Sequence, residues 1–543
     1  MINKSNLNRL LYILLAVFSL IFFVQGSVPL RNYNSDFIFK TELFFVLLCI
    51  LTNRTSAYKT LLQSKLLQIS LIAWIIYWVA QGLIGLEKEL SFDISYLFKM
   101  FHGVFVVFAV AVYQEFVGQK TTNSIDEPQT QVRNILVFAI LCVLTFSIGL
   151  IRVNGVLSTS NLVFQFEVVF ILACVFISNT IPSFSFYLKN NRATTFIFVS
   201  WILAVVISYN FSSYEISQNP FVYERLDQTI THGIFFVFSY DFMRRTNINK
   251  QFLPLMVPIS VFIVAGIFIV SWLTLKDGAH VDWFELTPMN NHIRHVGYVA
   301  TASASIALAF SLYPVKLDVK AIILFLLLLV SATLLFWTGG RAAVGSIILV
   351  FAFMVFYLAF TGNLGRSRLS ITFLLLISSF ILAEQLKVFD WNGIMGQLSR
   401  TVNSENVNSV TTGRLGVWQA SIESLKGNWL FGLGPQGYLY MPNRIWGAQP
   451  HNMFIQFLVE WGVVGTILFL LLLSIAGLKL LHFIKTASKL PSVLFFSGVA
   501  VFVGLSIHGL TDGTYYHSQP SYYIALALAL CLSEMTIQKN ETE

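Results

Sequence analysis

Long apolar runs recur from one end of the chain to the other, separated by mostly short polar connections. A run of about 20 residues, folded as a helix, crosses the roughly 30 Å hydrocarbon core of a membrane. We predict about sixteen spans from this pattern, near residues 9–27, 35–52, 66–84, 94–114, 134–151, 160–179, 194–209, 229–243, 253–275, 295–314, 319–337, 342–360, 368–384, 452–478, 491–508 and 521–537. The fold expected is therefore all-α: a polytopic integral membrane helical bundle of about 12–16 transmembrane helices.

One connection, residues 385–451, is far longer than the others. In its stretch "TTGRLGVWQASIESL", Leu415, Trp418, Ile422 and Leu425 recur at helical spacing after a threonine cap. We predict a functional loop that contains short amphipathic helices lying at the membrane surface. The resulting divisions are N-terminal helices 1–252, central helices 253–384, the large loop 385–451 and C-terminal helices 452–543.

Composition supports the membrane interpretation, because 56% of residues are hydrophobic and only 11% are charged. The net charge is +8, and 20 of the 34 Lys and Arg fall in the N-terminus, the C-terminus and the connections on one side of the predicted bundle. This asymmetry follows the positive-inside rule, so both termini are expected in the cytoplasm and no nucleic-acid partner is implied. The four cysteines all lie inside apolar runs, which predicts packing residues and not a disulfide framework or a zinc site.

Three arginines stand at the opposite, outer ends of predicted helices: Arg294 in "NNHIRHVGY", Arg341 in "WTGGRAAVG" and Arg414 in "TTGRLGVW". Each alone is compatible with snorkelling to lipid head groups. Three arginines together on the side where the positive-inside rule disfavours cations indicate that they bind an anion. The planar guanidinium group suits a phosphate or diphosphate. Two glycines before Arg341 also permit a tight turn that brings backbone amides toward the same anion.

A His-Asn pair, His451 and Asn452, begins the apolar run that follows the large loop. A neutral histidine at this water boundary can accept a proton from a hydroxyl, although a capping or interfacial histidine fits the same position. The remaining outer histidines, including His508 and His517 near Asp512, have spacing that is weak evidence for a metal, and we predict no metal site.

The segment "HNMFIQFLVEWGVVGT" resembles the signature of bacterial O-antigen ligases and their relatives, the O-antigen polymerases and protein O-oligosaccharyltransferases. Its fixed positions are the His-Asn pair, Gly462 after nine intervening residues, and Gly465 with Thr466. The resemblance extends through "TGGRAAVG", "GRLGVW" and "FGLGPQGY", over roughly residues 285–525. The GxGxxG pattern within the last of these is not a dinucleotide fingerprint, since no strand precedes it and a proline interrupts it.

The resemblance implies a metal-independent, cofactor-free, inverting transfer at the periplasmic face of the bacterial inner membrane. A glycan on undecaprenyl diphosphate passes to an acceptor hydroxyl, with His451 as the base and with Arg294 and Arg341 holding the diphosphate. The expected substrate-binding residues are Arg414, Asn452, Trp418 and His517.

The complete His-Asn signature favours an O-antigen ligase, whose acceptor is lipid A-core. The alternatives are an O-antigen polymerase, which extends another lipid-linked repeat, and a protein O-oligosaccharyltransferase acting on pilin-like proteins. A transporter of lipid-linked sugars would also need many spans and a basic cavity. The position of the charges at outer helix ends, beside a long loop, favours the enzyme.

Overall fold

The structure is a computed structural model that describes residues 127–540, with gaps at 151–155, 212–219, 275–291, 315–317, 389–392, 405–406 and 488–489 and with only isolated positions between 179 and 190. The predicted spans near 9–27, 35–52, 66–84 and 94–114 lie outside the described residues. Two compact units divide the chain: Met1–Ile140 with Val168–Asn179, and Leu141–Glu167 with Thr180–Glu543. All site residues discussed below belong to the second unit.

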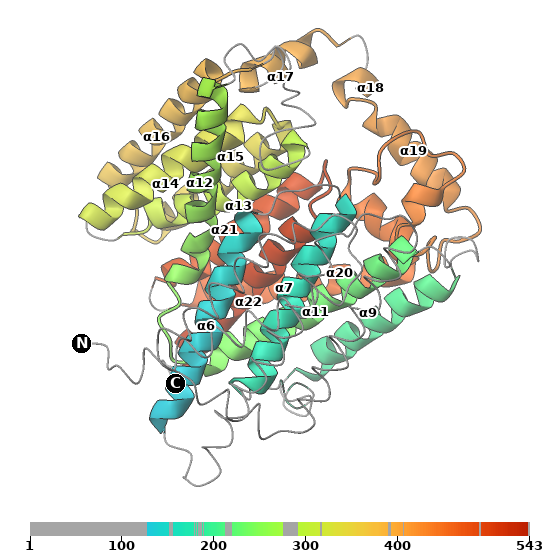
Figure 1. The fold of residues 1–543 in the computed structure, drawn as a ribbon, viewed down its shortest axis with the longest axis horizontal. Coiled ribbons are helices and arrows are strands. Elements are labelled where there is room, and N and C mark those ends of the chain that lie inside the picture. Colours follow the sequence, from blue (N-terminus) through green and yellow to red (C-terminus); the bar gives the residue numbers. More distant parts are fainter. Residues whose placement is uncertain are drawn as a thin grey trace, which may run out of the picture. The chain divides into compact units, whose positions relative to one another are not determined.

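Helices account for every regular element of the described residues, and no strand occurs among them. The long helices are α6 (Glu127–Leu150), α7 (Val156–Phe176), α9 (Arg192–Phe211), α11 (Pro220–Arg245), α12 (Phe252–Thr274), α13 (Ile293–Leu312), α14 (Val319–Trp337), α15 (Arg341–Phe360), α16 (Arg366–Gln385), α20 (Met453–Thr486), α21 (Val493–Gly509) and α22 (Ser518–Asn540) (Figure 1). Shorter elements within the large loop are α17 (Gly393–Val402), α18 (Val407–Val410), α19 (Arg414–Ser424) and the 3₁₀ turn η1 (Gly437–Tyr440).

Each predicted span from 134–151 onward coincides with one of these long helices. Nine helices of the described residues are long and apolar enough to cross a membrane. The prediction of an all-α, multi-pass membrane protein is therefore confirmed. Helix α11 is not among the nine, because it carries buried polar residues such as Arg225 and Asp241.

Helix α13 is the centre of the second unit and is buried along nearly its whole length. Its sequence "VATASASIALAF" is rich in alanine and serine, which let neighbouring helix backbones approach closely inside a membrane. Helices α12, α14, α15 and α21 pack around it. Helices α13, α15 and α20 begin, and α21 terminates, at the same end of the bundle. We name this the loop end, because the large loop attaches there.

Helix α20 is broken at Gly462, whose backbone is left-handed with φ 64° and ψ −170°. A segment of the large loop fills the break: the amides of Val463 and Val464 donate to the carbonyls of Trp429 (2.8 Å) and Leu430 (3.1 Å). In return, the amide of Leu433 donates to Val459 on α20 (2.7 Å). Because freed backbone groups are costly in a membrane, this pairing stabilises the break and fastens the loop to the helix.

Replacement of Gly462 by alanine is expected to destabilise the protein. A Cβ atom at Gly462 would collide with the Leu430 carbonyl, and a left-handed non-glycine residue costs at least about 1 kcal/mol. Gly477 lies further along the same helix, and a Cβ there meets no atom within 4 Å. Thermal unfolding in detergent should show a lower melting temperature for Gly462→Ala and little change for Gly477→Ala. Equal melting temperatures for the two variants would contradict this account of the break.

Candidate active site at the loop end

His451 occupies a strained turn immediately before α20. Its backbone is left-handed, with φ 54°, and its side chain is buried. Its amide donates to the side-chain oxygen of Gln449 (2.9 Å), and the ring lies 5.2 Å from that of Trp446. A non-glycine residue in this conformation costs about 1–3 kcal/mol, and such strain persists mainly where a site requires a particular geometry.

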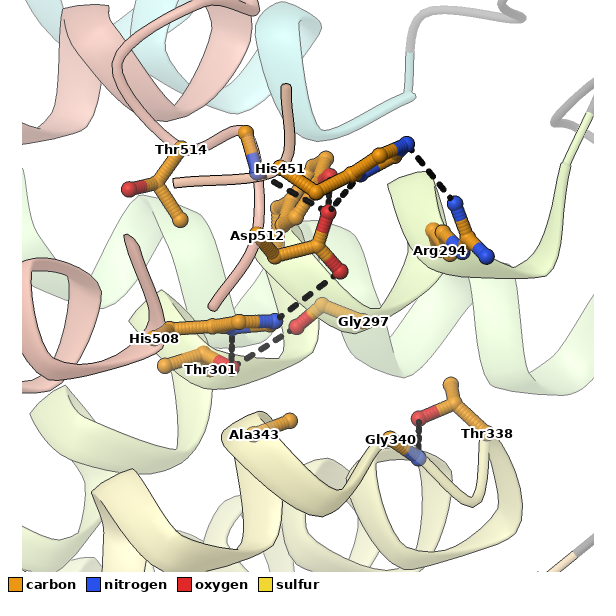
Figure 2. Close-up of polar contacts among 12 residues, drawn as sticks. Arg294, Gly297, Thr301, Thr338, Gly340, Ala343, His451, His508, Asp512 and Thr514 are labelled. Atoms are coloured by element: carbon orange, nitrogen blue, oxygen red, sulfur yellow. Dashed lines mark hydrogen bonds and ion pairs between the residues drawn. The ribbon is translucent and has the colours of Figure 1, made fainter. Parts of the chain in front are cut away.

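Asp512 lies in the connection between α21 and α22 and holds the imidazole of His451. Its Oδ1 accepts a hydrogen bond from Nδ1 of His451 (2.9 Å) (Figure 2). The same oxygen accepts from the hydroxyl of Tyr298 (2.8 Å) and the amide of Gly513 (2.9 Å). Its Oδ2 is 3.8 Å from the guanidinium of Arg414. Burial opposes the charge of Asp512, but the hydrogen bond from His451 and the nearby guanidinium groups hold the pKa of its carboxyl well below the usual range.

The position of the proton on His451 follows from this arrangement. An ionised Asp512 only accepts, so Nδ1 of His451 carries the hydrogen and Nε2 keeps its lone pair. The side-chain amide nitrogen of Gln449 also lies 3.0 Å from Nδ1. Burial lowers the pKa of His451, and the positive charges of Arg294 and Arg414 lower it further, against the opposing effect of Asp512. The imidazole is therefore neutral near pH 7. Its Nε2 lies 3.2 Å from Nη1 of Arg294, which donates to it (Figure 2).

A cavity of about 820 Å³ lies beside this pair at the loop end. Four helices each contribute one arginine to its wall: Arg294 from α13, Arg341 from α15, Arg400 from α17 and Arg414 from α19. Asp512 is the only carboxylate among the lining residues. We call this space the arginine cavity. Its charge and its size suit a doubly charged or larger anion such as a diphosphate.

Backbone groups add to the positive potential of the arginine cavity. Gly339 is left-handed, with φ 68°, and Gly340 precedes the first turn of α15 without any side-chain cap. Ala342 and Ala343, in that first turn, line the cavity. Uncapped amides at a helix start attract anions, as the sequence predicted for this turn.

A second, deeper pair fixes the loop that carries Asp512. Arg225 and Glu460 are fully buried and form a salt bridge at 3.2 Å between α11 and α20. The guanidinium of Arg225 also donates to the carbonyls of Tyr515 (3.2 Å) and Tyr516 (2.9 Å), while Glu460 accepts from the amide of Gln436 in the large loop (3.2 Å). This network holds α11, α20, the large loop and the 510–517 connection in one arrangement.

Four of the residues predicted from the sequence meet at this site, namely Arg294, Arg341, Arg414 and His451. Trp418 joins them, because it lines the arginine cavity and its Nε1 donates to the carbonyl of Pro450, directly before His451 (2.8 Å). The structure thus brings together side chains that lie more than 150 residues apart in the sequence.

Asn452 and His517 lie outside the cavity wall. Asn452 caps α20, accepting from the amides of Phe454 and Ile455, and its Nδ2 donates to the carbonyl of Leu510 (2.9 Å). His517 is buried, with its ring 4.5 Å from that of His295, and burial holds its pKa well below the usual range. The substrate-binding roles of these two residues stay predictions.

The sequence analysis did not predict two residues of this site, Asp512 and Arg400. Asp512 was considered only as part of weak evidence for a metal site, because nothing in the local spacing links it to His451, which precedes it by 61 positions. Arg400 had a usable signal, since it lies on the polar side of the amphipathic stretch "GIMGQLSRTV". Among the residues that the structure describes, no group of three His, Cys, Asp or Glu is placed to hold a metal ion.

The arginine cavity is expected to bind inorganic pyrophosphate. Arg400→Gln should weaken this binding about tenfold, since it removes one charge-assisted contact worth roughly 1.5 kcal/mol. Arg366→Gln, at the start of α16 and away from the cavity, is the control. Calorimetry in detergent at low ionic strength measures both. An unchanged affinity in Arg400→Gln would contradict the assignment of the cavity as an anion site.

Comparison with known proteins gives one family match, which covers part of the chain. No curated protein matches the chain. Residues 323–470 match the family model described as O-antigen ligase. This segment holds Arg341, Arg400, Arg414 and His451, whereas Arg294 and Asp512 lie on either side of it. Over residues 323–470 the chain thus matches the O-antigen ligase family of membrane glycosyltransferases, which confirms the resemblance drawn from the His-Asn signature.

Proposed function

We propose that the protein transfers a glycan from undecaprenyl diphosphate to an acceptor hydroxyl and that it is an O-antigen ligase acting on lipid A-core. One observation carries the proposal. The neutral side chain of His451 is oriented by the buried carboxylate of Asp512. Its unprotonated nitrogen, Nε2, lies 3.2 Å from Arg294, which lines a cavity together with three further arginines. A base and an anion site at this separation suit a substitution in which a hydroxyl attacks and a diphosphate leaves.

In the proposed reaction, the acceptor oxygen attacks the anomeric carbon of the glycan, and the bond from that carbon to the diphosphate oxygen breaks. Nε2 of His451 takes the hydroxyl proton, while the electron pair of the broken bond leaves on the diphosphate. Attack opposite to the leaving group inverts the anomeric centre. A base positioned in this way contributes about 10²–10⁴-fold to the rate.

The arginines act on the charge that develops as the bond breaks. Fixed cations stabilise a transition state best when they already point to the place where charge appears. Arg341 is suited to this role, because it begins α15 next to the uncapped amides and is held by a hydrogen bond to Thr401 (2.9 Å). The four guanidinium groups supply the positive charge, so the proposed step uses no metal ion and no cofactor.

Arg294 links the two halves of the site. Without substrate, it donates to Nε2 of His451, which blocks the lone pair that must accept the proton. A diphosphate is a much stronger acceptor than a neutral imidazole, because hydrogen bonds between charged partners are roughly twice as strong. Donor binding would draw Arg294 away from His451, free Nε2 and raise the pKa of His451. The lipid donor is then required before the base can act.

The proposal also includes the location of the enzyme. Since the loops with most cations are expected in the cytoplasm, the loop end faces the periplasm and the protein lies in the bacterial inner membrane. Both termini are then cytoplasmic. A transporter of lipid-linked sugars would share the basic cavity, but a carboxylate-oriented histidine at its edge supports an enzyme.

His451→Ala and Arg341→Ala are each expected to abolish glycan transfer while leaving the protein inserted and folded. Surface glycan in complemented cells, measured beside protein abundance in membranes, checks this. His482→Ala, near the end of the helix that follows His451, and Arg366→Ala, which begins α16 as Arg341 begins α15, are matched controls that should retain transfer. Normal surface glycan with either site variant would remove its assigned role.

Asp512→Asn is expected to lower kcat by at least about 100-fold, because the tautomer of His451 is no longer enforced. The pH profile of kcat/KM reports the free enzyme. In the wild type, its acidic limb should lie below pH 6.5, since the pKa of His451 is lowered from that value. The charge and hydrogen bond of Asp512 raise this pKa, so the limb should move to still lower pH in Asp512→Asn. A limb that moves to higher pH would contradict the arrangement.

A further inference from the structure

The arginine cavity continues onto one face of α15. Arg341, Ala342 and Ala343 form part of the cavity wall and are also the first turn of that helix. Gly345, Leu349 and Phe356 lie 3, 7 and 14 residues after Ala342, so all four positions are on one face of the helix. Leu349 and Phe356 on this face are 52% and 72% exposed. We call this face, Ala342 to Phe356, the α15 track.

Gly345 leaves the α15 track without a side chain one turn after Arg341. A Cβ atom at this position would meet nothing within 4 Å. It is the next position of the track after Ala342, which lines the cavity. The whole helix is about 30 Å long, so the track reaches across the hydrocarbon core.

Helix α17 contacts α15, and a hydrogen bond joins it to the first residue of that helix, Arg341. Thr401 near its end accepts the hydrogen bond from Arg341, and Gln397 and Arg400 line the arginine cavity. Its other side is apolar and open: Met395, Leu398 and Val402, spaced 3 and 4 residues apart, are all at least half exposed. One face of α17 therefore meets the anion site, and the other suits lipid.

We propose that the α15 track binds the polyprenyl chain of the lipid donor, with α17 over the junction between chain and diphosphate. This inference rests on the proposed function, because the diphosphate in the arginine cavity determines where the chain begins. The chain and the track match in chemistry: both are uncharged hydrocarbon, and the track starts at the cationic cavity that would hold the only charged part of the lipid.

A larger cavity of about 1310 Å³ lies between α9, α11, α20 and α22 and is the main rival location. It shares no lining residue with the arginine cavity. Its one arginine near the loop end, Arg225, is already bound to Glu460 and to two carbonyls. The α15 track shares Ala342 with the wall of the arginine cavity, whereas the larger cavity shares no residue with that wall, so the α15 track is favoured.

The test compares donors that carry the same glycan on a diphosphate with either undecaprenyl or a single isoprene unit. Gly345→Leu adds a bulky side chain to this open position of the track and is expected to raise KM for the undecaprenyl donor about tenfold, equivalent to roughly 1.4 kcal/mol of lost binding. KM for the single-isoprene donor should change less than about twofold, since most of the lost contacts are with the long chain. Transfer by purified protein in detergent, with one acceptor held constant, gives both values.

Two control variants make the test specific. Gly266→Leu, in α12, adds the same side chain at another exposed helix glycine with no atom within 4 Å, and it should leave both KM values unchanged. Ala476→Leu narrows the larger cavity and should also be neutral.

Three results would overturn the inference. A chain-length effect in Ala476→Leu instead of Gly345→Leu would put the chain in the larger cavity. Equal KM values for the two donors in the wild type would mean that the α15 track is covered only by bulk lipid. A wild-type protein that turns over neither donor would contradict the proposed function as well, and this outcome is distinguishable from the other two.

Discussion

The buried negative charge of Asp512 organises the loop end. A carboxylate in such a place is stable only if its oxygens are satisfied by donors and cations. Asp512 draws these from separate parts of the chain: Tyr298 from α13, Arg414 from α19 and His451 from the turn before α20. The same contacts that stabilise the charge therefore assemble the site, and they keep His451 in one tautomer.

The His-Asn signature acquires a physical meaning from the fold. Asn452 caps the first turn of α20, so His451 is held at the loop end. Gly462 opens the helix for the large loop, and the hydroxyl of Thr466 donates to its carbonyl (2.6 Å). Gly465 faces Trp461, where a Cβ atom would come within 2.5 Å of the tryptophan Cβ. The fixed spacing thus ties the base at one end of α20 to the anchor of the loop that carries Arg414.

The sequence could predict those features of the fold and the site that depend on residues near one another in the chain. The spans followed from the length and hydropathy of each run, and the three arginines followed from their position against the charge asymmetry. Partners such as Asp512, and the Arg225–Glu460 pair that holds its loop, arise from contacts between distant segments, which no local pattern encodes. The prediction of an amphipathic surface helix at α19 was incomplete for the same reason. Leu425 and Trp418 pack in the core of the large loop, and the more exposed apolar side chains belong to α17.

The central claim is a transfer in which a hydroxyl replaces a lipid diphosphate under control of the arginine cavity and His451. The most direct measurement uses purified protein in vesicles with a labelled glycan on undecaprenyl diphosphate, a chelator, and three acceptors in parallel: lipid A-core, a second lipid-linked repeat and a pilin-like protein. The account predicts labelled lipid A-core with release of one undecaprenyl diphosphate for each glycan transferred. Consumption of donor with none of the three acceptors, or transfer that requires an added metal ion, would contradict it.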